Sequence, residues 1–202
     1  MRPFLATLIP AAIAAAAPAY AETAALAEVA AHLRGITTMT ADFVQTDRQG
    51  KALSGTLSLK QPGRIRFQYQ KGVPLLIVGD GKSLTMIDYS VRQVSRWPVG
   101  NSPLSVLIDP RKDIGRFARM VPSPVAGTIM VEARDPEHPE FGTITIAFAR
   151  GRGPGGLILQ GWTVLDAQNG RSTLRLANQR YGIPISDRTF KWDDPRPKGP
   201  RK

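Results

Sequence analysis

Short segments in which apolar and polar residues alternate constrain the fold of this chain more than any other feature of its sequence. In residues 64–69, Ile65, Phe67 and Tyr69 alternate with arginine and glutamine. Alternation with this period places the apolar side chains on one face of a β-strand and the polar side chains on the other. The segment is therefore predicted to be a strand with one buried face.

The same pattern, bounded by turn residues, recurs along most of the chain. Turn signals include Gln61-Pro62-Gly63 and Asn169-Gly170. A sheet of about nine to eleven strands with one apolar face does not stay flat, so we expect a mainly β (α+β), antiparallel sheet that curls into a barrel or half-barrel. The predicted strands cover residues 56–60, 64–69, 75–78, 83–88, 93–97, 128–132, 143–148, 157–165 and 172–178.

Two segments have helical rather than strand character. Leu26, Val29 and Leu33 recur at near-helical spacing, which predicts an amphipathic helix over residues 23–34. Residues 103–108 begin with a proline that follows Asn-Ser, and they predict a second, short helix. Both helices have one apolar side, so we expect them to cover the concave face of the sheet.

The start of the chain has the pattern of a cleavable export signal. An apolar run over residues 5–17 is followed by Ala19-Tyr20-Ala21, and small residues at these two alanine positions are typical of a cleavage site before Glu22. The run is shorter than the roughly 20 apolar residues that span a bilayer. The expected division is a signal peptide at 1–21, one domain at 22–192 and a basic, Pro-rich tail at 193–202.

The chain contains no cysteine, and this narrows the class of protein. A disulfide framework, a thiolate metal site and a thiol nucleophile are all excluded. No cysteine follows Ala21, so the chain cannot be acylated there as a lipoprotein. We therefore expect a protein that works outside the cytoplasm without a lipid anchor.

The charge of the chain indicates the kind of surface that it meets. The net charge is +11. Outside the cytoplasm, such a balance favours anionic lipid surfaces or acidic partners over nucleic acid. In the strand at 64–69, moreover, alternation puts the arginines and the aromatic rings on opposite faces, whereas a nucleic-acid site needs them together. We expect no nucleic-acid partner.

Side chains suited to catalysis or metal binding are few. Of the two histidines, His32 lies on the first predicted helix and is interpreted as a surface or lid-facing side chain, and His138 is interpreted as part of a solvated loop. The Gly-rich segment 151–156 lacks the Lys-Ser/Thr of a phosphate loop and is interpreted as a mobile hairpin tip. We expect no enzyme, no metal site and no cofactor.

Four short motifs occur in order between about Leu26 and Phe190. They are A-D-F-x-Q at 41–45, S-G-x-L-x-L-K-x-P-G-R-x-R-F at 54–67, D-G-K at 80–82 and S-P-L-S-V-L at 102–107. This combination resembles the LolA family of periplasmic outer-membrane lipoprotein carriers. The resemblance implies an unclosed antiparallel β-barrel with a helical lid over an apolar cavity.

The same resemblance implies a function and a set of partners. It implies a monomer in the periplasm of a Gram-negative bacterium that shields the acyl chains of triacylated lipoproteins and moves them from the inner to the outer membrane. The implied donor is an inner-membrane lipoprotein-releasing ABC transporter, and the implied acceptor is an outer-membrane lipoprotein receptor or an anionic lipid surface. Two alternatives stay open: a carrier of another lipid or glycolipid, and a periplasmic enzyme or signalling module on the same fold.

Candidate roles for individual residues follow from the resemblance. The family often carries an arginine immediately before the strand-turn proline, where it latches the lid; here that residue is Gln61, and Arg64 or Arg66 could compensate. The candidate cavity walls are Leu57, Leu59, Ile65, Phe67, Tyr69, Leu84, Met86, Ile144, Ile146 and Phe148. The candidate lid residues are Leu26, Val29, Leu33, Leu104, Leu107 and Ile108.

Overall fold

The computed structural model describes residues 17–99, 105–109, 114–135 and 139–197. The helices are α1 (Ala17–Gly35) and α2 (Ser105–Ile108), with single 3₁₀ turns at η2 (Ile114–Arg116), η3 (Pro139–Phe141), η4 (Pro154–Gly156) and η5 (Asp187–Phe190). The strands are β1 (Thr38–Thr46), β2 (Ala52–Lys60), β3 (Arg64–Tyr69), β4 (Leu75–Asp80), β5 (Ser83–Asp88), β6 (Gln93–Pro98), β7 (Ala118–Val121), β8 (Thr128–Arg134), β9 (Thr143–Arg150), β10 (Leu157–Leu165) and β11 (Arg171–Tyr181).

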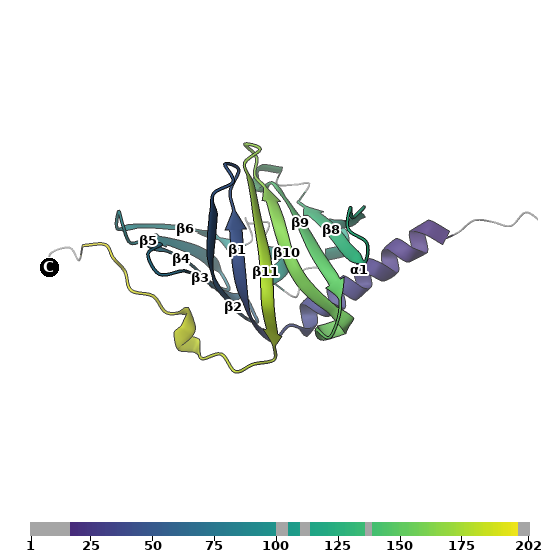
Figure 1. Cartoon of the computed structure of the whole chain (residues 1–202), viewed down its shortest axis with the longest axis horizontal. Coiled ribbons are helices and arrows are strands. Elements are labelled where there is room, and N and C mark those ends of the chain that lie inside the picture. The colour runs from purple at the N-terminus through teal and green to yellow at the C-terminus, as the bar shows by residue number, and fades with distance from the viewer. Residues whose placement is uncertain (1–16, 100–104, 110–113, 136–138, 198–202) are drawn as a thin grey trace, which may run out of the picture.

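The strands form one curved sheet in the order β6-β5-β4-β3-β2-β1-β11-β10-β9-β8-β7. Neighbours pair antiparallel throughout, and β1 joins the meander β1–β6 to the meander β7–β11 by pairing with β11. Figure 1 shows this sheet as a curved wall with α1 against one half of it. Because β6 and β7 are the two edges, the barrel is unclosed, as predicted.

The main hydrophobic core lies on the concave face of the sheet. Strand alternation supplies it: in β3 the residues Ile65, Phe67 and Tyr69 are buried, while the residues between them are not. The same core takes in Val29 of α1 and Ile108 of α2, neither of which has any exposed surface. Both helices therefore cover this face, as the sequence predicts.

A second, smaller cluster lies on the opposite face, and it corrects the prediction of a single apolar face. Leu76, Val78 and Ile87 of β4 and β5 are buried there against Phe190 and Trp192. Strand β4 begins with four consecutive apolar residues, a pattern typical of strands that are buried on both faces. The residues after β11 cross this outer face and cover it (Figure 1).

Several boundaries and elements differ from the predictions. Strands β1 and β7 were not predicted, and α1 begins at Ala17 rather than at residue 23, because its Ala-rich start has high helix propensity. The helix thus continues across the expected cleavage site, which stays a prediction together with the tail boundary at 193. No helix in the described ranges is long and apolar enough to cross a membrane.

The Gly-rich segment forms the tip between β9 and β10, as interpreted, but it packs against α1; its mobility stays a prediction. A Cβ atom added to Gly35 would lie 2.8 Å from Cβ of Pro154. A Cβ atom on Gly155 would lie 3.2 Å from the backbone nitrogen of His32. The glycines allow the tip to approach the end of α1 closely.

Two glycines in turns provide a matched test of this geometry. Gly50 (φ +81°) and Gly63 (φ +73°) both occupy the left-handed region, but a Cβ on Gly63 would lie 2.3 Å from Cα of Gly81, whereas one on Gly50 meets nothing within 4 Å. Gly50→Ala should lower the free energy of unfolding by about 1–2 kcal/mol, the backbone cost alone. Gly63→Ala should cost about 1–3 kcal/mol more because of the clash. Urea unfolding measures both free energies, and equal costs would contradict the close approach of Gly63 to Gly81.

Candidate functional site

The predicted cavity-wall residues lie together on the concave face. They come from β2, β3, β5 and β9, and all but Met86 are buried in the main cluster. Met86 pairs with Ile77 across β4 and β5 and is half-buried. The structure thus brings the candidates onto one continuous apolar surface, and their contact with a ligand stays a prediction.

Aromatic residues from three strands meet at the centre of this surface. The ring of Phe43 packs edge-to-face on Phe67 and Tyr69, with centroid distances of 5.8 Å and 5.2 Å, and Phe67 packs in the same way on Trp162 at 6.2 Å. The sequence analysis missed Phe43 and Trp162 as candidates. Alternation within β1, where Met39 is also buried, was the available signal for Phe43.

The hydroxyl group of Tyr69 does not introduce a charge into this surface. It donates a hydrogen bond to Oε1 of Gln45 over 2.5 Å. Burial raises the pKa of Tyr69 to about 12, so the phenol is neutral at physiological pH. The concave face near Tyr69 therefore remains uncharged.

The predicted lid residues also lie against this face where they are described. Val29 and Leu33 of α1 and Leu107 and Ile108 of α2 are buried in the main cluster, and Leu26 packs against it half-buried. Leu104 lies outside the described residues, as does His138. The two helices thus contribute apolar side chains to the same core as the sheet.

The side chain of Gln61 connects the β2–β3 turn to the lid. Its Nε2 donates to the carbonyl oxygen of Leu107 in α2 over 3.3 Å, and its Oε1 accepts from the backbone N–H of Gly63 over 3.2 Å. Gln61 therefore occupies the place expected of a latch, through one neutral hydrogen bond. A role in opening and closing the lid stays a prediction.

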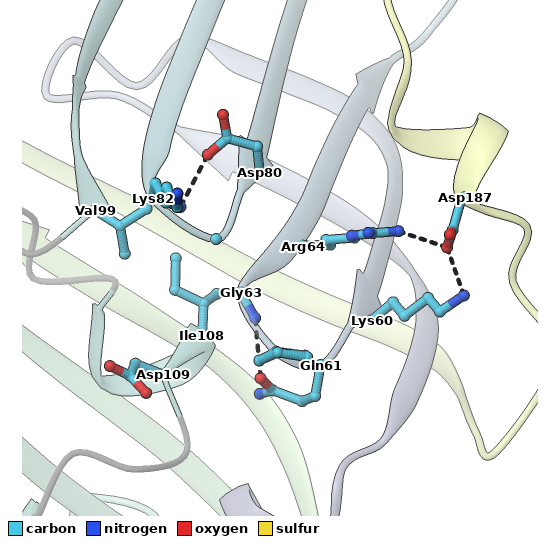
Figure 2. A pocket seen from close by; sticks show the side chains of 12 residues that line it. Lys60, Gln61, Gly63, Arg64, Asp80, Lys82, Val99, Ile108, Asp109 and Asp187 are labelled. Atoms are coloured by element: carbon cyan, nitrogen blue, oxygen red, sulfur yellow. Dashed lines mark hydrogen bonds and ion pairs between the residues drawn. The ribbon is translucent and has the colours of Figure 1, made fainter.

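Arg64 and Arg66 do not reach the lid, so their suggested role as substitute latches was wrong. Arg64 pairs with Asp187 over 2.5 Å, and Figure 2 shows it pointing away from Ile108 of α2. Arg66 donates to the carbonyl oxygens of Thr189 and Lys191. Alternation explains this, because the buried neighbour Ile65 faces the core and the arginines face outward.

A pocket of about 510 Å³ opens where the β2–β3 turn meets α2 (Figure 2). Buried side chains of Val99 and Ile108 form its apolar part. Hydrogen bonds from Lys60 and then Arg64 lower the pKa of Asp187 and keep that carboxylate ionised. The charged side chains that line the pocket are Lys60, Arg64, Lys82, Asp80, Asp109 and Asp187. The opposite charges balance, so this is a polar mouth beside the lid rather than an anion site.

His32 was interpreted as a surface or lid-facing side chain; it is buried, so the surface alternative was wrong. It lies on α1 with 0% exposure and contacts Phe148 and Tyr181. The spacing of Val29, His32, Leu33 and Ile36 places all four on one helical stripe, and this signal was present in the sequence. Within the described ranges, no three His, Asp or Glu residues form a group suited to a metal ion.

Comparisons with known proteins agree with this geometry. Residues 34–193 match the family model described as "Outer membrane lipoprotein carrier protein LolA". An outer-membrane lipoprotein carrier protein from Chromobacterium violaceum is 40% identical over 114 residues, which cover 53% of this chain and 55% of that protein. One from Dechloromonas aromatica is 29% identical over 99 residues, covering 45% of this chain and 48% of that protein. The matched region thus spans about half the length of each of these relatives.

A solved structure supports the fold. The DUF1329 family protein from Desulfovibrio piger superposes with a TM-score of 0.51 at 11% identity, over 84% of this chain and 96% of that chain. An identity this low shows that the fold is shared and carries no statement about activity.

The contact between Gln61 and α2 can be tested without disturbing the turn. Gln61→Glu keeps an acceptor for the N–H of Gly63 but removes the donor to Leu107. Loss of one hydrogen bond, about 1 kcal/mol, should speed hydrogen exchange by roughly fivefold at the amide of Asp109, which follows α2 and donates to the carbonyl oxygen of Ser105. Mass spectrometry or NMR measures this rate. In the control, Asp187→Asn weakens the contacts to Lys60 and Arg64 and should leave that amide unchanged; equal effects of the two variants would contradict a specific lid contact.

Proposed function

The chain belongs to the LolA family of outer membrane lipoprotein carrier proteins, and from this premise we propose that it carries lipoproteins by shielding their acyl chains on its concave face. The observation that supports the proposal is the continuous apolar surface of the sheet beneath α1 and α2. An acyl chain gains about 0.8 kcal/mol for each CH₂ group that leaves water. Burial of this kind needs no directional contact, so chains of different length can share one surface.

Acyl chains would enter over the half of the sheet that ends at β6. Leu75, Ile77 and Trp97 pack against the main core but are only half-buried. On the same face, Met86 is also half-buried. An arriving chain gains contact there at once, and it then replaces the helices over the deeper residues such as Ile144 and Ile146.

Release of the cargo requires a lid that opens at low cost. Gln61 makes one polar contact between the β2–β3 turn and α2, and a neutral hydrogen bond of this kind contributes only about 0.5–1.5 kcal/mol. Apolar contact of the helices with the core makes up a further part of the closure, and acyl chains can take over that part. A lid held in this way closes over the empty face and yields when cargo arrives.

The setting of this activity is part of the proposal. The export signal at 1–21 would deliver the chain to the periplasm, where a transporter in the inner membrane would load it. A receptor, or the anionic lipid of the outer membrane itself, would accept the cargo, and the net charge of +11 favours contact with such lipid. A carrier role requires no catalysis and no cofactor.

The function is tested by the molecules that the protein holds in its own cell. We expect triacylated lipoproteins to co-purify with the native protein, identified by mass spectrometry, and depletion of the protein to leave lipoproteins in the inner membrane. Glycolipids in place of lipoproteins would show that the protein carries that other class of lipid. Normal lipoprotein sorting after complete depletion would sink the proposal.

A matched pair of variants tests which face binds acyl chains. Ile77 is half-buried on the concave face, and Val44 is 46% exposed on the opposite face. Ile77→Asn should weaken binding of a tripalmitoylated peptide by roughly tenfold, since a lost side chain of this size is worth about 1.5 kcal/mol or more. Val44→Asn should leave binding unchanged. Titration of a fluorescent peptide measures both affinities. A larger effect of Val44→Asn would place the site on the opposite face of the sheet and contradict the proposal.

A further inference from the structure

The contact between α1 and the β9–β10 hairpin is made by a histidine. Nδ1 of His32 lies 2.6 Å from the carbonyl oxygen of Pro154 in η4. Because a carbonyl oxygen can only accept, Nδ1 carries a proton and donates it. This bond joins the last turns of α1 to the tip of the hairpin that packs under them.

Among the residues that the structure describes, the other ring nitrogen of His32 has no hydrogen-bond partner. Nε2 is buried and makes no hydrogen bond, and the rings of Phe148 and Tyr181 pack on the imidazole with centroid distances of 5.4 Å and 5.9 Å. A neutral ring leaves one unpaired lone pair in this place. A protonated ring would leave an unpaired N–H and a buried charge, which is far less favourable.

The ionisable groups around this contact do not compensate a charge on His32. Glu28, one turn earlier on α1, is paired with Arg150 of β9 over 2.6 Å. The hydroxyl of Tyr181 on β11 accepts from the backbone N–H of Leu159. At the hairpin tip, Arg152 is exposed and would repel a positive imidazole.

Groups on the remaining neighbours of α1 are engaged elsewhere. On β7, the backbone N–H of Met120 donates to Glu22 of α1, and Arg119 is paired with Glu132 of β8. Arg34, on the last turn of α1, is exposed and positive. No carboxylate named among these neighbours is therefore left to stabilise a protonated His32.

Burial lowers the pKa of His32 below its ordinary value of 6.5, and the hydrogen bond to Pro154 opposes this only in part. In the unfolded chain the imidazole takes up a proton below about pH 6.5, whereas in the folded chain it does so only at lower pH. The contribution of His32 to stability is thus complete above pH 6.5 and is lost as the pH falls below it.

We propose that neutral His32 is a positioning residue that pins the lid helix α1 to the β9–β10 hairpin, and that its protonation frees the helix from the concave face. The proposed link between α1 and the hairpin depends only on the contacts of His32. Its consequence for cargo, that mild acid opens the acyl-binding face, rests on the proposed carrier function.

Because the chain has only two histidines, their separate effects on stability can be measured. His32→Asn keeps a side-chain donor for Pro154 but cannot titrate, and His138→Gln removes the other imidazole. Between pH 8 and pH 5, the folded-to-unfolded ratio of the unaltered protein and of His138→Gln should fall by up to about tenfold for each pH unit below 6.5. The ratio for His32→Asn should stay flat over the same range. An equal pH dependence in His32→Asn and the unaltered protein would overturn the proposal.

Hydrogen exchange locates the effect, and it also serves if His32→Asn is too unstable to titrate. After correction for intrinsic rates, α1 of the unaltered protein should lose protection at pH 5.5 relative to pH 7.5, while β11 keeps it. His32→Ala, which lacks the donor, should show a less protected α1 at both pH values. Loss of protection spread evenly over the chain would show that His32 does not pin the helix.

Binding of a tripalmitoylated peptide at the two pH values separates this proposal from the carrier function. If acid frees α1 and also changes the affinity, the helix is a lid over the acyl-binding face. If acid frees α1 and the affinity does not change, the proposed role of His32 stands, and the proposed carrier function on this face fails.

Discussion

The pairing of β1 with β11 is the interaction on which the rest of the structure depends. It joins the first and the last strand, which lie far apart in the chain, and so unites the two meanders. It also sets Phe43 beside Leu176 on the concave face. Both side chains are buried. Without this seam the two halves of the sheet would each have a short apolar face, too narrow for the two helices and for a long acyl chain.

The concave face is covered by contacts that can be exchanged. Apolar side chains of α1 and α2 remove it from water, and apolar burial has no preferred direction. Two neutral hydrogen bonds, Gln61 with Leu107 and His32 with Pro154, help to fix the helices. Helix α1 is also held at the surface by the ion pair of Glu28 with Arg150. The proposed replacement of the helices by acyl chains therefore costs no described buried ion pair. The charged contacts of Lys60 and Arg64 lie on the other side of the sheet, where they hold the segment after β11 through Asp187.

The sequence predicted those features that depend on local pattern. Short apolar segments bounded by turn residues located nine of the strands. Alternation indicated the inward face of β3, and it could also have shown that Arg64 and Arg66 point away from the lid. Two further signals were present but were not used: the continuous apolar run at the start of β4, and the stripe on α1 that includes His32. Contacts such as Lys60 with Asp187 join residues more than a hundred positions apart, and no local pattern contains them. The partner of Gln61 was unpredictable for the same reason, although its place beside the lid followed from the family resemblance.

Fluorescence of a single tryptophan tests most directly whether the concave face holds acyl chains. The chain has three tryptophans; Trp162 is 6% exposed on the concave face, and Trp192 packs against the outer cluster. Each variant would keep either Trp162 or Trp192 as its one tryptophan, with the other two replaced. It would be mixed with a triacylated peptide whose acyl chains carry bromine, which quenches tryptophan at contact range. We predict strong quenching of Trp162 and little quenching of Trp192. Quenching of Trp192 without quenching of Trp162 would show that the acyl chains bind elsewhere and would contradict the account.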